Sequence, residues 1–501
     1  MQSARVVGNR RWILVATLLA TFLTAMETTV VSTALPTVIG ELQGVQLYAW
    51  VFSAYLLTST ATGPLYGRLA DIIGRKPIFI IGVVIFLIGS VLSGAATSMP
   101  LLILFRAVQG LGAGAVQPIV FTIVGDLFSL EERARVQGFF SAVWGSSSLA
   151  GPALGAIITE TIGWRWIFYI NLPFGIAAVA ILIWAMHEGH TEGKHRIDYA
   201  GAAALTAGVT VTLLGLLGGF DGGGIKWSYL FGGLAILALF IFIETRVPEP
   251  VLPLGLFRDP FIAIPCLIGL VIGLMQFGIP SYVPLFMQGV QFGTAGDAAK
   301  VLVAISGFWT IAAFLSPRLL LRFGFRAVAL GGMLLNTVGA AILLVFRQET
   351  PLVLIFISLA IIGFGLGFAA NSTLLASQNA VGWEQRGVVT ASVQFTRTMG
   401  GTIGVAVLGA VLNARLAPTL RAAGTADVNA LLEPASRAGL NEDVLTILRG
   451  GLASGLLGVY TIMLVVAVFG VLFALFIPAK ISARTAPVVA QPEAQPVGSD
   501  D

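Results

Sequence analysis

The chain has 501 residues, of which 57% are hydrophobic and 10% are charged, and its formal net charge is +4. A soluble globular domain carries roughly a quarter charged residues, so this composition excludes a water-soluble fold. A bilayer accepts such a chain, because a spanning helix needs about 20 mostly apolar residues and satisfies its own backbone hydrogen bonds. We therefore predict an all-α membrane protein. The single cysteine, Cys266, excludes a disulfide framework and a multi-cysteine metal site, and we expect no metal or other cofactor.

Apolar runs along the chain predict fourteen transmembrane helices. They cover about 12–34, 48–66, 77–97, 101–125, 136–159, 167–187, 199–218, 229–244, 261–286, 301–320, 327–346, 352–377, 388–413 and 453–477. The first run lacks a small-residue cleavage pattern and carries Glu27, so we expect it to stay in the mature protein rather than to be cleaved as a signal. The segment 415–450 is long enough to hold a short amphipathic helix.

Most of the 28 Lys and Arg residues fall in the segments that share a side with the N-terminus. The positive-inside rule then places both termini in the cytoplasm and the chain in the cytoplasmic (inner) cell membrane as a multi-pass protein. The basic balance reflects this orientation, and we expect no nucleic-acid partner. The histidines, His187, His190 and His195, share one polar stretch, which favours loop residues over a metal or pH-sensing site.

An internal repeat organises the chain. A shift of 253 residues places Gly110 on Gly363 and Arg133 on Arg386, and lays the first predicted helices on the ninth and those that follow. This period leaves room for two extra helices between parallel halves, an arrangement described for two-halved secondary transporters. We predict a six-helix bundle over 1–190, two inserted helices over 191–258, a second six-helix bundle over 259–478 and a disordered tail over 479–501.

Three ionisable residues lie well inside predicted helices, where each is costly and should face the bundle interior or a water-filled cavity: Glu27, Arg106 and Arg397. At 1.5 Å per residue, Glu27 and Arg106 both lie roughly 8–10 Å below the outer surface, so they can meet. An acid beside a permanent cation is a plausible proton-coupling element, and a purely structural ion pair is the alternative.

Arg397 lies near the midplane, with no acidic residue in the core of the second half to pair with it. It either faces a polar cavity, or it snorkels toward the membrane surface or binds backbone carbonyls at a helix break. The predicted substrate cavity is lined by polar residues from both halves: Gln109, Gln117, Gln276, Asn371, Gln394 and Arg397.

Two further segments are rich in glycine. The cytoplasmic loop between the second and third helices contains a predicted conformational gate made of Gly67, Asp71, Gly74, Arg75 and Lys76. The fifth helix carries Gly145, Gly151, Pro152 and Gly155, which indicate close packing against a neighbour and a possible kink.

Together these segments resemble the fourteen-helix drug:proton antiporters of the major facilitator superfamily over about residues 12–477. The loop from Gly67 to Lys76 is similar to the cytoplasmic signature, in which Asp71 and Arg75 would control the packing of the halves. "RAVQGLGAG" from Arg106 is similar to the fourth-helix signature, whose arginine is implicated in proton transfer. "GSSSLAGPALGA" from Gly145, which contains Gly151, Pro152 and Gly155, is similar to the fifth-helix antiporter signature, which distinguishes exporters from importers. "ETTVVSTALP" from Glu27 is similar to the first-helix segment, where aspartate is more usual.

The resemblance implies two bundles that rock around a central site and export small, largely apolar or cationic compounds in exchange for protons. A proton-coupled transporter of one specific metabolite is the alternative. A membrane-embedded enzyme is a third interpretation, which the sequence does not favour, because it has no HExxH motif and no histidine in the interior of a predicted helix. The expected partners are a small-molecule substrate, protons and the lipid bilayer, and we expect a functional monomer.

Overall fold

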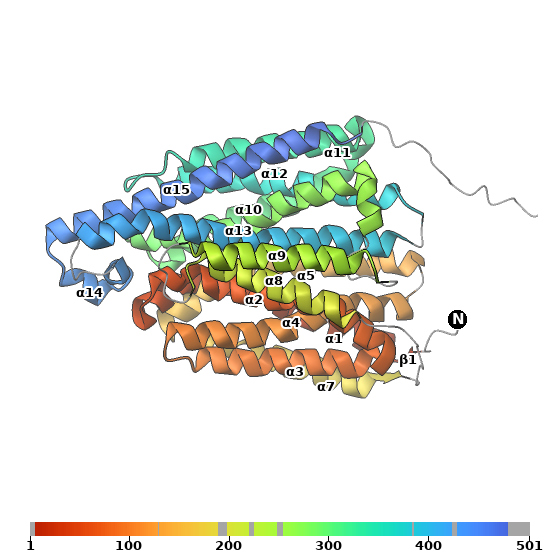
Figure 1. The fold of residues 1–501 in the computed structure, drawn as a ribbon. Helices are drawn as coiled ribbons and strands as arrows, with labels where there is room; N and C mark the ends of the chain where they lie inside the picture. Colours follow the sequence, from red (N-terminus) through yellow and green to blue (C-terminus); the bar gives the residue numbers. More distant parts are fainter. Residues whose placement is uncertain are drawn as a thin grey trace, which may run out of the picture.

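The computed structural model describes residues 6–128, 130–188, 198–219, 225–247, 254–382, 385–422 and 428–478. Figure 1 shows long helices that lie roughly along one axis. The first part of the chain forms β1 (Val6–Gly8), α1 (Arg10–Leu42), η1 (Val45–Leu47), α2 (Tyr48–Ile73), α3 (Arg75–Gly94), α4 (Met99–Leu127), α5 (Leu130–Thr161), α6 (Trp166–Tyr169), α7 (Asn171–Ala185) and β2 (Met186–Glu188).

The rest of the chain continues this pattern of long apolar helices. It forms α8 (Tyr199–Leu216), α9 (Trp227–Glu244), η2 (Leu254–Arg258), α10 (Pro260–Gly289), α11 (Ala295–Leu343), α12 (Leu352–Asn379), α13 (Arg386–Ala422), η4 (Val428–Leu431), α14 (Pro434–Ala438) and α15 (Glu442–Leu475). The predicted all-α membrane fold is confirmed, apart from the small sheet in which β1 pairs antiparallel with β2. Within the described ranges, ten helices are long and apolar enough to cross a membrane, and the count of fourteen stays a prediction.

The predicted helices over 301–320 and 327–346 both lie in the element α11, which consists of two helices joined at Gly324 (φ 79°, ψ 169°). The same conformation occurs at Gly74 (φ 110°, ψ 157°), which separates α2 from α3. Both are left-handed φ values that glycine adopts without a steric penalty. Each half of the chain therefore turns from its second long helix into its third at a glycine.

The helices of the two parts of the chain pair in the same way. In the first part α1 packs on α5 and α7, and α4 packs on α2 and α3. In the later part α10 packs on α13 and α15, and α11 packs on α12. The parts meet where α5 packs on α11 and where α2 packs on α13. Large apolar side chains cover the outside of the bundle, as at Leu104, Phe231 and Phe314, which suits a surface that faces lipid.

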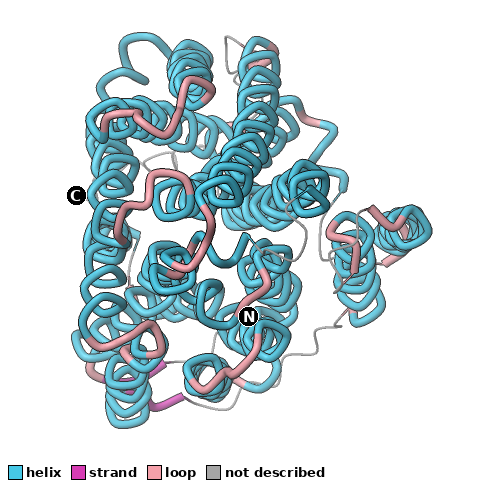
Figure 2. The backbone as a smooth tube through the Cα atoms, turned by 90° about the vertical axis from the view of Figure 1, so that its left-hand side faces the viewer, coloured by secondary structure: helices cyan, strands magenta, loops and turns pink. Residues whose placement is uncertain are grey.

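The pair α8 and α9 stands to one side of the bundle. These helices pack on each other, and α8 also contacts α2 and α13, one helix from each part. Figure 2 shows the pair set apart at the right of the end-on view. The inserted helices thus lie at the periphery, over a line where the two parts meet.

Polar contacts join the two parts at the end of the bundle opposite β1, where Figure 1 labels α14. On α1, Thr37 Oγ1 lies 3.1 Å from Gln288 Oε1 of α10, and Gln288 Nε2 donates to the Thr33 carbonyl at 2.9 Å. The Asn429 side-chain oxygen accepts from the backbone N–H groups of Gly44 and Val45 at 3.1 and 2.8 Å. The segment 415–450, whose described part includes the predicted short helix as α14, therefore takes part in this junction.

Near the β1 end, three glycines of α2, α5 and α13 have open space beside them. A Cβ built on Gly67, Gly138 or Gly387 would meet no atom within 4 Å. His187 lies in β2 with its side chain exposed, which corrects its expected place in a loop; its backbone pairs with Val7. His190, His195 and the predicted tail over 479–501 lie outside the described residues.

Candidate functional site

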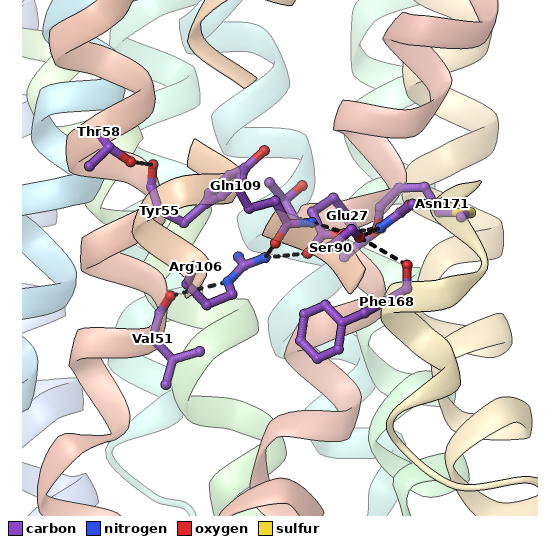
Figure 3. A network of polar contacts seen from close by, with 12 residues as sticks. Glu27, Val51, Tyr55, Thr58, Ser90, Arg106, Gln109, Phe168 and Asn171 are labelled. Atoms are coloured by element: carbon purple, nitrogen blue, oxygen red, sulfur yellow. Dashed lines mark hydrogen bonds and ion pairs between the residues drawn. The ribbon is translucent and has the colours of Figure 1, made fainter. Parts of the chain in front are cut away.

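Glu27 and Arg106 meet inside the first half of the bundle, as their predicted depths allow. Arg106 Nη1 of α4 forms an ion pair with Glu27 Oε1 of α1, and each side chain is only 1% exposed. Figure 3 shows the two side chains at the centre of a network of polar contacts. Two opposite charges this deep in the protein must be paired, because an unpaired buried ion is strongly destabilising.

The second oxygen of the Glu27 carboxylate is also bound. Asn171 Nδ2, at the start of α7, lies 2.6 Å from Glu27 Oε2 and 2.8 Å from Ser90 Oγ of α3. Ser90 Oγ in turn donates to the Phe168 carbonyl at 2.9 Å. The carboxylate therefore ties α1 to α4 on one side and to α3 and α7 on the other.

Arg106 is held on several sides as well. Its Nη1 lies 2.6 Å from Gln109 Oε1, its Nε lies 3.4 Å from the Val51 carbonyl, and its guanidinium carbon lies 4.3 Å from the centre of the Tyr55 ring. Gln109 Nε2 reaches Ser90 Oγ at 3.1 Å, which closes the network. The guanidinium thus has a carboxylate, an amide, a carbonyl and an aromatic face around it.

This geometry is compatible with both hypotheses for the pair. A structural ion pair would show the same saturated contacts, and so would the deprotonated state of a coupling acid. The partners Asn171 and Ser90 are absent from the sequence-based candidates. In the sequence, Asn171 and Ser90 are single polar residues in two apolar runs. Such a pattern does not tell which way the side chains face.

The predicted substrate-cavity residues do not gather in one place. Gln109 is fully buried in the ion-pair network rather than facing a cavity. Gln117 of α4 is partly exposed, and Gln276 of α10 has a buried Oε1 with no hydrogen-bond partner among the described residues. By contrast, Asn371, Gln394 and Arg397 line one small cavity between α10, α11, α12 and α13.

Four of the five predicted gate residues can be described, and the side chain of Asp71 lies outside the described part. Gly67 is partly exposed on α2, and Gly74 forms the turn into α3. Arg75 Nε pairs with Asp126 Oδ2 of α4 at 3.0 Å. This contact lies inside the first half, and control of the packing between the halves by Arg75 stays a prediction.

Glu188 of β2 was not among the sequence-based candidates, yet it anchors this turn. Its two carboxylate oxygens accept from the backbone N–H groups of Arg75 and Lys76 at 2.8 and 2.9 Å, at the N-terminus of α3. A carboxylate there satisfies free N–H groups and faces the positive end of the helix dipole. Lys76 Nζ donates to the carbonyls of Ile183 and Met186 at 2.9 and 2.6 Å, which fastens the same corner to the end of α7.

The glycines of the fifth helix pack against α1. A Cβ on Gly151 would lie 1.9 Å from Thr29 Oγ1, and one on Gly155 would lie 2.4 Å from Thr33 Oγ1. Pro152 lies inside α5 between them, and its carbonyl accepts from Thr33 at 3.5 Å. Gly145 instead faces Thr310 of α11, in the other half. Close packing thus accounts for Gly151 and Gly155, and an exchange-specific role stays a prediction.

Within the described ranges, no group of three or more His, Cys, Asp and Glu side chains is placed to hold a metal ion.

Comparison with known proteins gives one consistent result. The profile of the Major Facilitator Superfamily matches residues 17–405. The multidrug transporter protein MdtP of Bacillus subtilis is 36% identical over 414 residues, which cover 81% of this chain and 76% of the relative. Multidrug resistance protein 3 of the same organism is 33% identical, covering 81% of this chain and 80% of the relative.

Solved structures agree on the fold. An inward-facing, unoccupied bacterial homologue of the human lysosomal transporter Spinster aligns with a TM-score of 0.68 at 16% identity, over 94% of this chain and 98% of the other. A D-xylose–proton symporter aligns with a TM-score of 0.60 at 13% identity, over 94% and 98% of the two chains.

Proposed function

Because this chain belongs to the Major Facilitator Superfamily, a family of membrane transporters and not of enzymes, we propose that it exports small, largely apolar or cationic compounds in exchange for protons. The family, the fold and the multidrug transporters among its relatives identify the chain as a multi-pass membrane transporter of small molecules. The coupling to protons and the direction of transport are our proposal.

One observation carries the proposed coupling: a carboxylate buried in the membrane part of the bundle is held by an arginine. Glu27 accepts from Arg106 and Asn171 only while it is ionised on both oxygens. A proton on either oxygen converts an acceptor into a donor and removes the charge that Arg106 faces. Protonation would therefore loosen α1 from α4 and α7.

The same helix carries the junction between the halves. Thr33 and Thr37 lie six and ten residues beyond Glu27 on α1, about 9 and 15 Å along the helix axis, and both contact Gln288 of the other half. A shift of α1 after protonation would act directly on this junction. We propose that the structure is the state closed at the α14 end and open toward the β1 end, and that proton binding favours the opposite state.

This proposal includes the predicted organisation. The bundles over 1–190 and 259–478 would rock about their interface, with the helices of 191–258 at the side. The β1 end would face the cytoplasm, with both termini there, in the inner cell membrane. The chain would act as a monomer, because substrate and protons would both pass between its own two halves.

Transport into inverted membrane vesicles tests the proposal. Wild-type protein should drive uptake of rhodamine 6G, a cationic dye, into vesicles with an acidic lumen, and a protonophore should abolish the uptake. Glu27→Gln should lose proton-driven uptake, because its amide cannot exchange a proton. Glu41→Gln is the matched control, since Glu41 lies on the same helix but pairs with Arg165 at the exposed end.

Two results would contradict the proposal. If wild-type vesicles take up none of a panel of apolar and cationic dyes, multidrug export is wrong and a transporter of one metabolite becomes the better explanation. If Glu27→Gln retains uptake that depends on the pH gradient, Glu27 is not the coupling acid.

A further inference from the structure

The second half of the bundle contains a small cavity with an arginine in its wall. The cavity has a volume of about 60 Å³ and lies between Gly269 of α10, Trp309 of α11, Asn371 of α12, and Gln394 and Arg397 of α13. This is room for a group of a few non-hydrogen atoms, because a water takes up roughly 30 Å³ in the liquid. The cavity is therefore the size of one polar group of a larger molecule.

Arg397 has no partner of its own in the part of the chain that the structure describes. The acidic residues described in the second half, such as Asp297, Glu349 and Glu442, lie near helix ends. The helix-break explanation for Arg397 also fails, because α13 runs as one helix from Arg386 to Ala422 and offers no free carbonyls beside it.

Arg106 in the first half has the acidic partner that Arg397 lacks among the described residues. Arg106 also lies inside its half of the bundle, and it is neutralised by Glu27. The cost of an unpaired ion in a membrane interior is several kcal/mol, so proteins pair such ions or place them where a ligand does so. Arg397 has the second arrangement, with a small cavity in place of an acid.

The other polar groups of the wall suit an anion. The Gln394 amide has no hydrogen-bond partner among the described side chains, so its N–H groups are available to an acceptor. Asn371 Nδ2 lies 3.4 Å from Ser316 Oγ, a weak contact that a stronger acceptor can replace. A guanidinium with neighbouring amides binds a carboxylate through two parallel hydrogen bonds.

Tight packing fixes the position of Arg397. A Cβ on Gly273 would lie 1.8 Å from the Arg397 carbonyl oxygen, and one on Gly269 would lie 3.6 Å from its backbone nitrogen. The backbone of Arg397 thus packs closely against α10, which fixes the position from which its side chain extends to the cavity. A ligand that binds there meets a preorganised cation.

We propose that this cavity is the binding subsite for a carboxylate group of the transported compound. The inference rests on the proposed export function and narrows it: the preferred substrates are apolar molecules that carry a carboxylate, whether or not they also carry a positive charge. A compound without a carboxylate gains no affinity from Arg397 and should bind more weakly.

Binding of two related dyes tests the subsite without any proton gradient. Rhodamine B and its ethyl ester share the same dye and differ in whether the carboxyl group is free. Fluorescence anisotropy with purified protein in a nonionic detergent should show that wild type binds the free acid about tenfold or more tightly than the ester, as expected for a charge-assisted pair. Arg397→Gln should lose this preference, and Arg397→Lys should retain part of it.

Asn371→Asp provides a test that does not depend on removing the arginine. It places a carboxylate in the same cavity, so it should weaken binding of the acid about tenfold or more while leaving the ester unaffected. Arg347→Gln, which removes an arginine of the same half that binds the carbonyls of Leu344 and Phe346, is the matched control and should bind both dyes like wild type.

Equal affinity of wild type for the acid and the ester, or an unchanged preference in Arg397→Gln, would overturn the subsite. Loss of the preference in nanodiscs that contain anionic lipid, but not in those of phosphatidylcholine alone, would also overturn it, because the cavity would then hold a lipid anion. The binding test and the transport test can fail independently. If wild type prefers the free acid through Arg397 but shows no proton-driven uptake, only the exchange mechanism is refuted.

Discussion

The largest single-residue effect on stability is expected at Glu27, and Glu41 provides an internal comparison. Both acids lie on α1 and both pair with an arginine. The Glu27–Arg106 side chains are 1% exposed, whereas those of Glu41 and Arg165 are 50% and 39% exposed. Replacing either acid by Gln keeps the size of the side chain and removes the charge, so the comparison isolates the effect of burial.

For Glu27→Gln the loss has two sources. Arg106 keeps its charge at a buried position, and the new amide turns one of its hydrogen-bond donors toward Arg106 or Asn171. Breaking a buried pair from one side costs about 3–5 kcal/mol, whereas an exposed pair such as Glu41–Arg165 contributes about 0–1 kcal/mol. Thermal unfolding of the detergent-solubilised protein, followed by tryptophan fluorescence, should therefore show a large fall in melting temperature for Glu27→Gln and a small one for Glu41→Gln.

A double variant distinguishes the buried charge from the lost contact. In Glu27→Gln with Arg106→Gln both charges are absent, so part of the stability lost in Glu27→Gln should return. Equal, small shifts for Glu27→Gln and Glu41→Gln would refute the reasoning, because they would mean that Arg106 finds water or another partner once the acid is gone.

Three further effects follow from local contacts. Gly151→Val should destabilise the protein by about 1–3 kcal/mol in the same unfolding assay, because its Cβ would overlap Thr29. Gly138→Ala on the same helix meets open space, so it should not destabilise the protein. Glu188→Ala removes the acceptor of the first N–H groups of α3, at a cost of about 0.5–2 kcal/mol, and hydrogen–deuterium exchange should rise at Arg75 and Lys76 but not in α12. Asn429→Leu removes the acceptor for the N–H groups of Gly44 and Val45 and should loosen the junction between the halves. A Thr37→Cys reporter in a Cys266→Ser background should then react about fivefold faster with an impermeant maleimide. An unchanged rate would show that this contact does not hold the junction closed.

The depth of the charged residues could be predicted from the sequence, because a helix advances by a fixed distance per residue. That rule placed Glu27 and Arg106 at one level, and the structure brings them together. The burial of Gln109 was also within reach: it lies three residues from Arg106, so both share one face of α4 and Gln109 follows the arginine into the network.

Other features needed the three-dimensional arrangement. Asn171 reaches Glu27 only because α7 packs on α1, and apolar runs do not tell which face of a helix meets which neighbour. The strands β1 and β2 have three residues each, too short for any periodicity to show. Gly324 falls on Asp71 in the sequence repeat, yet it adopts the conformation of Gly74, because a turn with positive φ selects glycine whatever the alignment of neighbouring residues.

The two arginines in the membrane interior suggest how the halves divide the work of exchange. Arg106 is neutral as a unit with Glu27, so its half changes charge only when a proton arrives. Arg397 lines a small cavity, so its half changes charge when an anionic group arrives. On this proposal a proton acts on the first half through Glu27, and a carboxylate acts on the second half through Arg397. Exchange would then require no direct contact between the proton and the substrate.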